Sequence, residues 1–288
     1  MKKKHKPIAG TMTWGLWGKR LDTDAMSALM QTYLDLGIET FDHADIYGDH
    51  TTEAQFGKAF VKSNIQRDQI KLISKCGIKS LHPSATYTVK HYDYSEAYII
   101  HQCETSLTNL RTDHLDVFLL HRPSPLMTAE VIASAISKLL ASGKIKEFGV
   151  SNFEAHHLEL LRKYLPVMHN QISFSLTDNV AMTNGLLDYM HINGIMPSAW
   201  SPLGTFFKAE DQINIRIRAA LHDLQKKYHV PYETLVLAWL YKHPSSIAPV
   251  VGTTDPTRIK NLMDAMTLDL NDEDWFVLWE AQRSAKVP

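Results

Sequence analysis

The sequence predicts an α/β protein, a single (β/α)8 TIM barrel with its active site at the carboxyl-terminal face of the strands. Strand-like and helix-like patterns alternate along the chain without a break in composition, and eight strand patterns can be counted. The length of 288 residues suits one such barrel. No Gly-x-Gly-x-x-Gly follows the first strand, which counts against a doubly wound dinucleotide-binding fold. One domain over residues 1–288 is therefore expected.

Short apolar runs mark the expected strands. The run at Leu115–Leu120 is almost continuously apolar, as in a strand that is buried on both faces. The expected strands are 8–12, 38–41, 70–74, 115–120, 145–150, 169–172, 195–200 and 247–251.

Apolar residues at helical spacing mark the segments between the strands. Met26, Leu29, Met30 and Tyr33 recur at i, i+3, i+4 and i+7, and Asp22 or Thr23 is available as a cap. Long connections at 78–94 and 203–211 fall on the face where barrels bind substrates. The expected helices are 23–36, 52–62, 95–110, 131–141, 154–165, 185–192, 218–228, 234–242 and 272–281.

Composition narrows the range of partners. A formal net charge of -1 gives no general attraction to nucleic acid or to an anionic membrane. Cys76 and Cys103 cannot form a disulfide framework, which favours a reducing compartment and a cytoplasmic location. The basic start of the chain runs into Pro7 where a signal peptide needs an apolar run, and no apolar stretch approaches the ~20 residues of a membrane span.

Four polar residues are expected at three successive strand ends. Asp42 and Tyr47 follow the second strand, Lys75 ends the third, and His121 follows the fourth. Because free tyrosine has a pKa near 10, proton donation by Tyr47 near neutral pH calls for a fixed cation. Lys75 is that cation, held by Asp42, and its charge is expected to lower the pKa of the phenol. His121 is a donor well placed to orient a carbonyl oxygen.

Each of these four residues also has a structural interpretation. Asp42 with Lys75 could form an ordinary ion pair at the end of a barrel, and single tyrosines and histidines at strand ends usually pack or cap. The joint occurrence at successive strand ends favours catalysis.

Motifs along nearly the whole chain resemble those of the aldo-keto reductase family. The resemblance is closest to a bacterial subgroup with His-Ala-Asp-Ile-Tyr-Gly at 43–48 and His-Arg-Pro at 121–123. The matching motifs are Asp42-x-Ala44-x-x-Tyr47, Ser74-Lys75, Leu115-Asp116 with His121, Gly149-Val150-Ser151-Asn152-Phe153, Asn170-Gln171 and Ala199-Trp200-Ser201-Pro202-Leu203-Gly204.

The resemblance implies an NADPH-dependent oxidoreductase that reduces a small-molecule aldehyde or ketone to an alcohol by hydride transfer. Tyr47 would be the general acid tuned by Lys75 and Asp42, and His121 would orient the carbonyl. The substrate pocket would include Trp14, Tyr47 and His121. Trp14 would line that pocket, although an aromatic residue in this place could equally plug the barrel end. The long connection at 78–94 would form another wall.

The resemblance also implies a site for NADP(H). Ser151, Asn152 and Gln171 would bind the carboxamide, Trp200 would stack on the nicotinamide, and Arg258 would face the 2′-phosphate. Here Asp255 or Thr254 could instead cap a helix with Pro256 at its first position, and both interpretations can hold. The sequence departs from the family at Gly252, often a lysine, and at 261–262, often Glu-Asn. The implied cofactor-binding residues are Thr13, Asp42, Ser151, Asn152, Gln171, Trp200, Ser201, Leu203, Gly252, Thr253, Thr254, Arg258 and Asn261.

Three other kinds of protein remain open from the residues alone. A non-catalytic cofactor-binding subunit would not need the group at Asp42, Tyr47, Lys75 and His121. A metal-dependent barrel hydrolase is suggested by fifteen histidines, but most of them fall on predicted helices and connections, so no metal is expected. Schiff-base chemistry at Lys75 would need a neutral lysine, which the neighbouring Asp42 opposes.

Overall fold

The computed structural model describes residues 4–82 and 85–287. Eight strands form a closed barrel in the order β1-β10-β9-β8-β7-β6-β3-β2, which confirms the predicted (β/α)8 fold class. The barrel strands are β1 (Ile8–Gly10), β2 (Thr40–Asp42), β3 (Lys71–Cys76), β6 (Leu115–Leu120), β7 (Ile145–Ser151), β8 (His169–Ser173), β9 (Met196–Trp200) and β10 (Ala248–Val251).

Two compact units make up the chain. One comprises Ile8–Gln171, and the other comprises Met1–Pro7 with Ile172–Pro288. The expectation of one domain over residues 1–288 stays a prediction.

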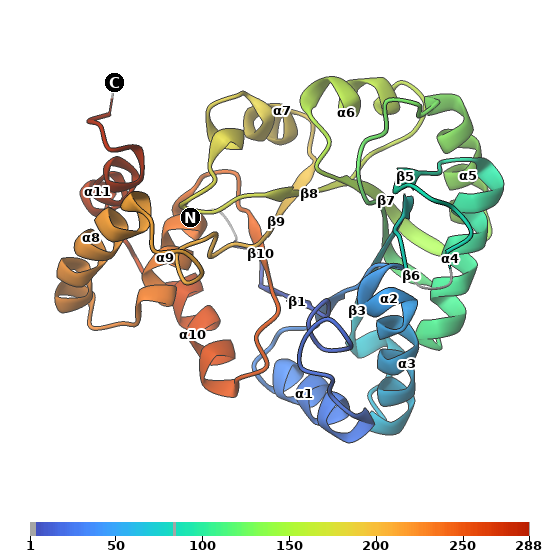
Figure 1. Cartoon of the computed structure of the whole chain (residues 1–288), viewed down its shortest axis with the longest axis horizontal. Helices are drawn as coiled ribbons and strands as arrows, with labels where there is room; N and C mark the ends of the chain where they lie inside the picture. Colours follow the sequence, from blue (N-terminus) through green and yellow to red (C-terminus); the bar gives the residue numbers. More distant parts are fainter. Residues whose placement is uncertain (1–3, 83–84, 288) are drawn as a thin grey trace. The chain divides into compact units, whose positions relative to one another are not determined.

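In the Ile8–Gln171 unit, consecutive parallel strands bring the polar strand ends together. Asp42 pairs in register with Ile73, and Lys75 pairs with Leu119, so β2, β3 and β6 end at the same edge. Figure 1 shows the larger helices of this unit outside the strands. The helical segments are α1 (Thr23–Asp35), α2 (Tyr47–His50), α3 (Thr52–Ser63), η1 (Arg67–Gln69), α4 (Glu96–Leu110), α5 (Ala129–Ala141) and α6 (Ala155–Arg162).

Side-chain caps explain where two helices of this unit begin. Asp22 accepts a hydrogen bond from Ala25 N at 2.8 Å and caps α1, as the sequence predicted. Ser95 caps α4 by accepting from Tyr98 N at 3.4 Å, so the helix proper begins at Glu96. Helix α1 buries Met26 and Tyr33 on the predicted face.

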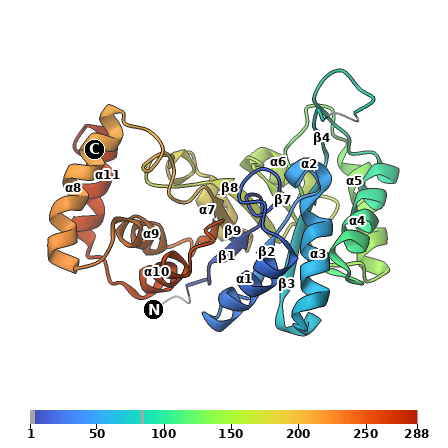
Figure 2. The ribbon, with the colours of Figure 1, turned by 60° about the horizontal axis from the view of Figure 1, so that its bottom comes forward.

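A small hairpin inside the 78–94 connection was not predicted. Strand β4 (Ile78–Lys79) pairs antiparallel with β5 (His91–Tyr92), and β4 is marked in Figure 2. Two residues in each strand are too few for an alternating pattern to be visible in the sequence.

In the Ile172–Pro288 unit, helices α8 and α11 lie side by side in both views (Figures 1 and 2). Arg216 Nε donates to Ala281 O at 2.9 Å, and Lys227 Nζ donates to Asp274 Oδ2 at 2.7 Å. Trp239 and Trp275 also hold α9 against α11, with ring centroids 5.0 Å apart. The helical segments are η2 (Val180–Met182), α7 (Leu186–Ile192), α8 (Gln212–Tyr228), α9 (Tyr232–Lys242), α10 (Pro256–Thr267) and α11 (Asp272–Arg283).

The predicted start of the α8 helix at residue 218 was wrong. The helix begins at Gln212 because the Asp211 side chain accepts from Asn214 N at 2.8 Å and caps it. Asn214 is buried although it is polar, so the hydrophobic pattern did not extend to the true beginning of the helix.

Candidate active site

Lys75, near the end of β3, contacts three of the predicted polar groups. Its side chain is 0% exposed, and Nζ donates to Asp42 Oδ1 at 2.8 Å and Oδ2 at 2.7 Å. Nζ also donates to His43 O at 2.7 Å and to the Tyr47 hydroxyl oxygen at 3.2 Å. Burial lowers the pKa of Lys75, but Asp42 and Tyr47 outweigh burial and the pKa lies above its usual value. Lys75 is therefore charged, which counts against Schiff-base chemistry.

Tyr47 begins helix α2, and its ring is buried against Ala44, Ile46 and Ile78. An ammonium group can only donate, so the Tyr47 oxygen is the acceptor in its contact with Lys75. The hydroxyl proton of Tyr47 consequently points away from Lys75. The geometry leaves Tyr47 as a proton donor toward another group.

Burial and the Lys75 charge act on the pKa of Tyr47 in opposite directions. The Lys75 charge lowers the pKa of the phenol, as predicted, but burial raises it more, and the pKa lies above its usual value. Tyr47 is therefore neutral near pH 7 and carries the proton that an acid must give. Because an alkoxide is a stronger base than a phenolate, a raised phenol pKa does not prevent protonation of an alkoxide.

His121 follows strand β6 and lies beside Tyr47. Its backbone N donates to Cys76 O at 2.9 Å, and its ring centroid is 6.1 Å from that of Tyr47. Burial, followed by the charges of Lys75 and other cations, holds the pKa of His121 well below its usual value. A neutral imidazole has one N–H donor and one acceptor nitrogen, which suits a group that orients a carbonyl oxygen.

Gln171 in β8 is linked to this cluster through Asp42. Gln171 Nε2 donates to Asp42 Oδ1 at 2.9 Å. Because a carboxylate only accepts hydrogen bonds, this contact fixes which end of the Gln171 amide faces Asp42. The amide oxygen of Gln171 is then the acceptor for a ligand N–H.

Ser151, at the end of β7, can act as a hydrogen-bond donor to a ligand, whereas Gln171 can act as an acceptor. Its hydroxyl oxygen accepts from Asn152 Nδ2 at 2.9 Å and from Arg122 Nη1 at 3.2 Å. With two donors on the oxygen, the Ser151 hydroxyl proton is available for donation. Ser151 and Gln171 together offer one donor and one acceptor, which are the two partners that a carboxamide needs.

Arg122 was not predicted as a site residue. It is half-buried, and Nη1 donates to His121 O at 2.7 Å as well as to Ser151. The Tyr94 hydroxyl contacts both the backbone O and the backbone N of Arg122, the latter at 3.2 Å. In the sequence, Arg122 was marked only by its position directly after His121. Strand alternation ends before this position, so it does not predict where the side chain points.

Gly77 makes room for the Tyr94 ring. Its φ is +111°, and a Cβ at this position would lie 2.1 Å from Tyr94 Cε1. Asp93 N donates to Gly77 O at 3.0 Å, so the two ends of the 78–93 segment meet here. The segment is therefore anchored at its base to the strand end that carries His121.

Trp14 is buried in an aromatic cluster. It is 0% exposed and packs against Tyr33, Phe41 and Phe56, as the interpretation as a plug expects, and its role in a substrate pocket stays a prediction. Thr13 before it accepts from Lys19 N at 2.7 Å through its carbonyl. An aromatic residue at the start of a loop can turn inward as readily as outward, which the sequence alone does not decide.

Trp17, in the same loop, is the exposed aromatic residue beside Tyr47. It is 42% exposed, its ring lies 6.2 Å from that of Tyr47, and its Nε1 donates to Asp49 Oδ1 at 3.0 Å. Asp49 belongs to a left-handed turn with φ of +52°, and Gly48 before it has φ of +58°. The sequence signal for Trp17 was only a second tryptophan three residues after Trp14.

The remaining cofactor candidates belong to the Ile172–Pro288 unit. Trp200 ends β9, with Ser201 and Leu203 in the turn that follows, and Gly252, Thr253 and Thr254 follow β10. Asp255 caps α10 by accepting from Thr257 N at 2.8 Å and Arg258 N at 3.4 Å, and Pro256 is the first helical residue, as predicted. Arg258 is exposed, whereas Asn261 Nδ2 donates to Glu233 Oε1 at 3.1 Å. Their contacts with a cofactor stay predictions.

His43 and Asp45 are buried behind the cluster. His43 Nδ1 shares a hydrogen bond of 2.9 Å with Thr11 Oγ1, and burial lowers the pKa of His43 to about 3. Burial also raises the pKa of Asp45 well above its usual value. His43 is therefore neutral near pH 7, and burial disfavours the charged form of Asp45.

Residues of the 78–94 connection divide between two places. Tyr92 packs against the cluster of Tyr47 and Ile78. His82 and Tyr87 instead line a separate cavity of about 290 Å³ together with His50, Lys79 and Tyr98. Within the connection predicted as a wall, Tyr92 therefore packs at Tyr47, whereas His82 and Tyr87 lie at the separate cavity.

Within residues 4–82 and 85–287, no three His, Cys, Asp or Glu side chains are grouped so that they could hold a metal ion. Within the same ranges, no helix has the length and apolar character needed to cross a membrane.

Comparison with known proteins gives a consistent family. A model described as the aldo/keto reductase family matches residues 8–281. The chain is 39% identical to the uncharacterized oxidoreductase YcsN of Bacillus subtilis, over 95% of this chain and 94% of that protein. It is 37% identical to a 6-dehydroglucose reductase of Agrobacterium fabrum, over 93% of this chain and 92% of that protein.

A solved structure shares the fold. The aldo/keto reductase of Klebsiella pneumoniae, crystallised with NADP and acetate, matches with a TM-score of 0.79 at 23% identity. The match covers 98% of this chain and 91% of that one.

Proposed function

Because the chain belongs to the aldo/keto reductase family, we propose that it is an NADPH-dependent reductase that converts an aldehyde or a ketone into an alcohol. Tyr47 is the general acid, Lys75 and Asp42 hold and tune it, and His121 orients the carbonyl. The observation that carries this proposal is the buried Lys75 ammonium, which contacts both Asp42 and the Tyr47 hydroxyl.

The donor and acceptor set suits a nicotinamide carboxamide. Ser151 offers a hydroxyl proton, because its oxygen already accepts from Arg122 and Asn152. Gln171 offers an amide oxygen, because its nitrogen faces Asp42. When bound, the reduced cofactor supplies a hydride to the carbonyl carbon.

Side chains of the protein orient the carbonyl and supply the proton that its oxygen receives. The N–H of neutral His121 binds the carbonyl oxygen and fixes its direction, and Tyr47 gives its hydroxyl proton to that oxygen. The resulting phenolate is stabilised by the Lys75 ammonium, which already lies 3.2 Å from the Tyr47 oxygen. Asp42 keeps Lys75 in place through two contacts of 2.8 and 2.7 Å.

We propose that Arg258 gives the protein its preference for NADP over NAD by binding the 2′-phosphate. Its exposed guanidinium at the start of α10 can bind a phosphate group through paired hydrogen bonds. Replacement by alanine, Arg258→Ala, should weaken NADPH binding roughly 10- to 100-fold and leave NADH nearly unaffected, which parallel fluorescence titrations can measure. Equal weakening of both cofactors would exclude Arg258 from the 2′-phosphate site, and Lys260→Ala in the same helix is the matched control.

A sugar-derived carbonyl is the substrate class that we propose first. The relative from Agrobacterium fabrum is a 6-dehydroglucose reductase, and it is 37% identical over 93% of this chain. Trp17 supports the proposal because it presents an exposed aromatic face beside Tyr47, and such faces bind the C–H groups of ligands.

NADPH consumption with a panel of sugar aldehydes, simple aldehydes, ketones and quinones tests the reaction. We expect turnover that depends on the carbonyl and stops without it. Tight NADPH binding with no turnover across the whole panel would reject the reductase and favour a cofactor-binding regulatory subunit.

A further inference from the structure

Arg122 joins two parts of the proposed site. Its Nη1 donates to His121 O at 2.7 Å and to Ser151 Oγ at 3.2 Å. The Tyr94 hydroxyl holds the Arg122 backbone from the other side through its contacts with N and O. The guanidinium is therefore fixed between the strand end of His121 and the strand end of Ser151.

We propose that Arg122 is a positioning residue for the reduction: it orients the Ser151 hydroxyl toward the cofactor carboxamide and adds a second positive charge at His121, whose ring lies beside that of Tyr47. This inference rests on the function proposed above. It assigns a role to a half-buried cation that the proton transfer itself does not use.

The first part of the role acts through hydrogen-bond polarity. A serine hydroxyl has one proton and accepts at its oxygen, so the two donors on Ser151, from Arg122 and Asn152, leave the proton for an outward contact. Without Arg122, the Ser151 hydroxyl gains a second rotamer choice and its proton is less often directed at a ligand. Cofactor affinity should therefore fall when the Arg122 donor is removed.

The second part acts through charge. The groups that act on the phenol of Tyr47 are Lys75 on β3, Asp42 on β2 and Arg122 after β6. Asp42 offsets much of the Lys75 charge, and the guanidinium adds a further positive charge that lowers the pKa of the phenol. It favours the phenolate, and it also acts with Lys75 and Lys90 to keep His121 neutral. The phenols of Tyr47, Tyr92 and Tyr94 act in turn on Arg122.

Two variants separate the two parts. Arg122→Gln keeps an N–H donor and removes the charge, whereas Arg122→Met removes both. The dissociation constant of NADPH, measured by quenching of tryptophan fluorescence, should rise roughly 5- to 10-fold in Arg122→Met and stay within about twofold in Arg122→Gln. The double variant with Ser151→Ala should bind no more weakly than Ser151→Ala alone, because both changes remove the same contact.

The pH dependence of turnover tests the charge. The alkaline limb, where Tyr47 loses its proton, should move upward by roughly half to one pH unit in Arg122→Gln. A merely structural residue would lower the rate at all pH values and leave the limb in place. Arg67→Gln is the matched control, since Arg67 is a partly buried arginine at the opposite end of β3.

Either of two results would overturn the proposal: NADPH binding by Arg122→Met equal to that of the unchanged protein, or an alkaline limb in Arg122→Gln at the original pH. The binding arm needs no turnover. If the unchanged protein reduces no carbonyl, the proposed function fails while the binding cycle still decides the role of Arg122.

Discussion

Strand β3 runs between two ion pairs, Arg67–Asp116 near its start and Lys75–Asp42 near its end. Both pairs have an N–O distance of 2.7 Å. They differ in what surrounds the cation. The same pairing chemistry joins strands at one edge of the barrel and, at the other, places a cation beside the Tyr47 hydroxyl.

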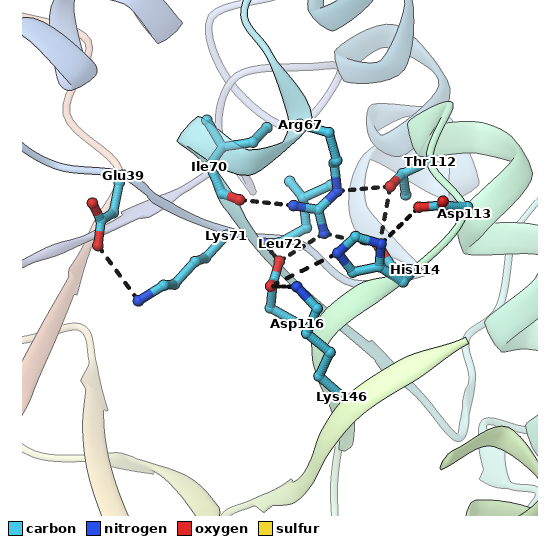
Figure 3. Close-up of polar contacts among 10 residues, drawn as sticks. All are labelled: Glu39, Arg67, Ile70, Lys71, Leu72, Thr112, Asp113, His114, Asp116 and Lys146. Atoms are coloured by element: carbon cyan, nitrogen blue, oxygen red, sulfur yellow. Dashed lines mark hydrogen bonds and ion pairs between the residues drawn. The ribbon is translucent and has the colours of Figure 1, made fainter. Parts of the chain in front are cut away.

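Near the start of β3, every arm of the Arg67 guanidinium has a fixed acceptor (Figure 3). Nε donates to Thr112 Oγ1 at 2.7 Å, Nη1 to Ile70 O at 2.7 Å, and Nη2 to His114 O at 2.9 Å as well as to Asp116. Asp116 also accepts from the backbone of Leu72 at 2.9 Å and from Lys146 at 3.0 Å, which joins β3, β6 and β7. The contacts are structural throughout.

Near the end of β3, the cation is a lysine and one of its acceptors is a phenol. A compact ammonium acts as a point charge on whatever oxygen lies beside it, whereas a guanidinium matches planar acceptors. Lys75 is fully buried, so its charge acts on Tyr47 without much solvent screening. The two pairs therefore differ in that the forked guanidinium of Arg67 bonds only fixed acceptors, whereas the point charge of Lys75 also acts on a phenol that we propose as a general acid.

The largest effect is expected from removing the phenol that Lys75 contacts. Tyr47→Phe removes the acidic proton and should lower kcat by roughly 10²- to 10⁴-fold with little change in NADPH affinity. Stopped-flow and steady-state rates, with a fluorescence titration, measure both quantities.

A second tyrosine gives the control for that change. Tyr87 donates its hydroxyl proton to Ser80 O at 2.8 Å and lines the separate cavity, so Tyr87→Phe should leave kcat within about threefold. Equal losses in the two variants would remove Tyr47 from its proposed role.

A smaller effect is expected from breaking the stabilising pair. Arg67→Met deletes contacts to β6 and the start of β3 and should lower the free energy of unfolding by about 2–4 kcal/mol. Denaturant titration measures this loss, and kcat per folded molecule should be unchanged. A kcat lowered tenfold in folded Arg67→Met would mean that the two ends of β3 are not separate in function.

The smallest expected effect is on the loss of stability at acid pH, to which Asp116 contributes. Burial raises the pKa of Asp116, but the Leu72 N–H, Arg67 and Lys146 outweigh burial and hold the pKa below its usual value. A depressed carboxyl pKa gives stability that is present above the unfolded value, near pH 4, and is lost as pH falls through the folded value. Asp116→Asn should be about 1–2 kcal/mol less stable at pH 7 and should lose less stability between pH 5 and pH 2. Parallel acid unfolding curves for the two proteins would contradict this assignment.

The sequence predicted the barrel and the four polar strand ends because both follow from strand register. Once β2, β3 and β6 run parallel, Asp42, Lys75 and His121 must approach the same edge. The structure brings them together with Tyr47 as expected, although their catalytic roles stay predictions.

Side-chain direction in loops could not be predicted in the same way. Trp14 turned inward and Trp17 outward within the one loop at 11–22, and no periodicity distinguishes them. The rise in the Tyr47 pKa could not be predicted from the sequence for a related reason. The burial of Tyr47 depends on Ile78 and Tyr92 in the hairpin, which is distant from Tyr47 in the sequence. Arg122 became a candidate only when its distance to Ser151 was known.

The snug fit of Gly77 against Tyr94 has a consequence for protein engineering. A Cβ on Gly77 would overlap the Tyr94 ring at 2.1 Å, so these two residues tolerate little exchange. Gly77 and Tyr94 mark the ends of a segment that can be replaced as a unit by the corresponding segment of a relative. Under the proposed function, such chimaeras would test whether this segment sets the range of carbonyls that the protein reduces.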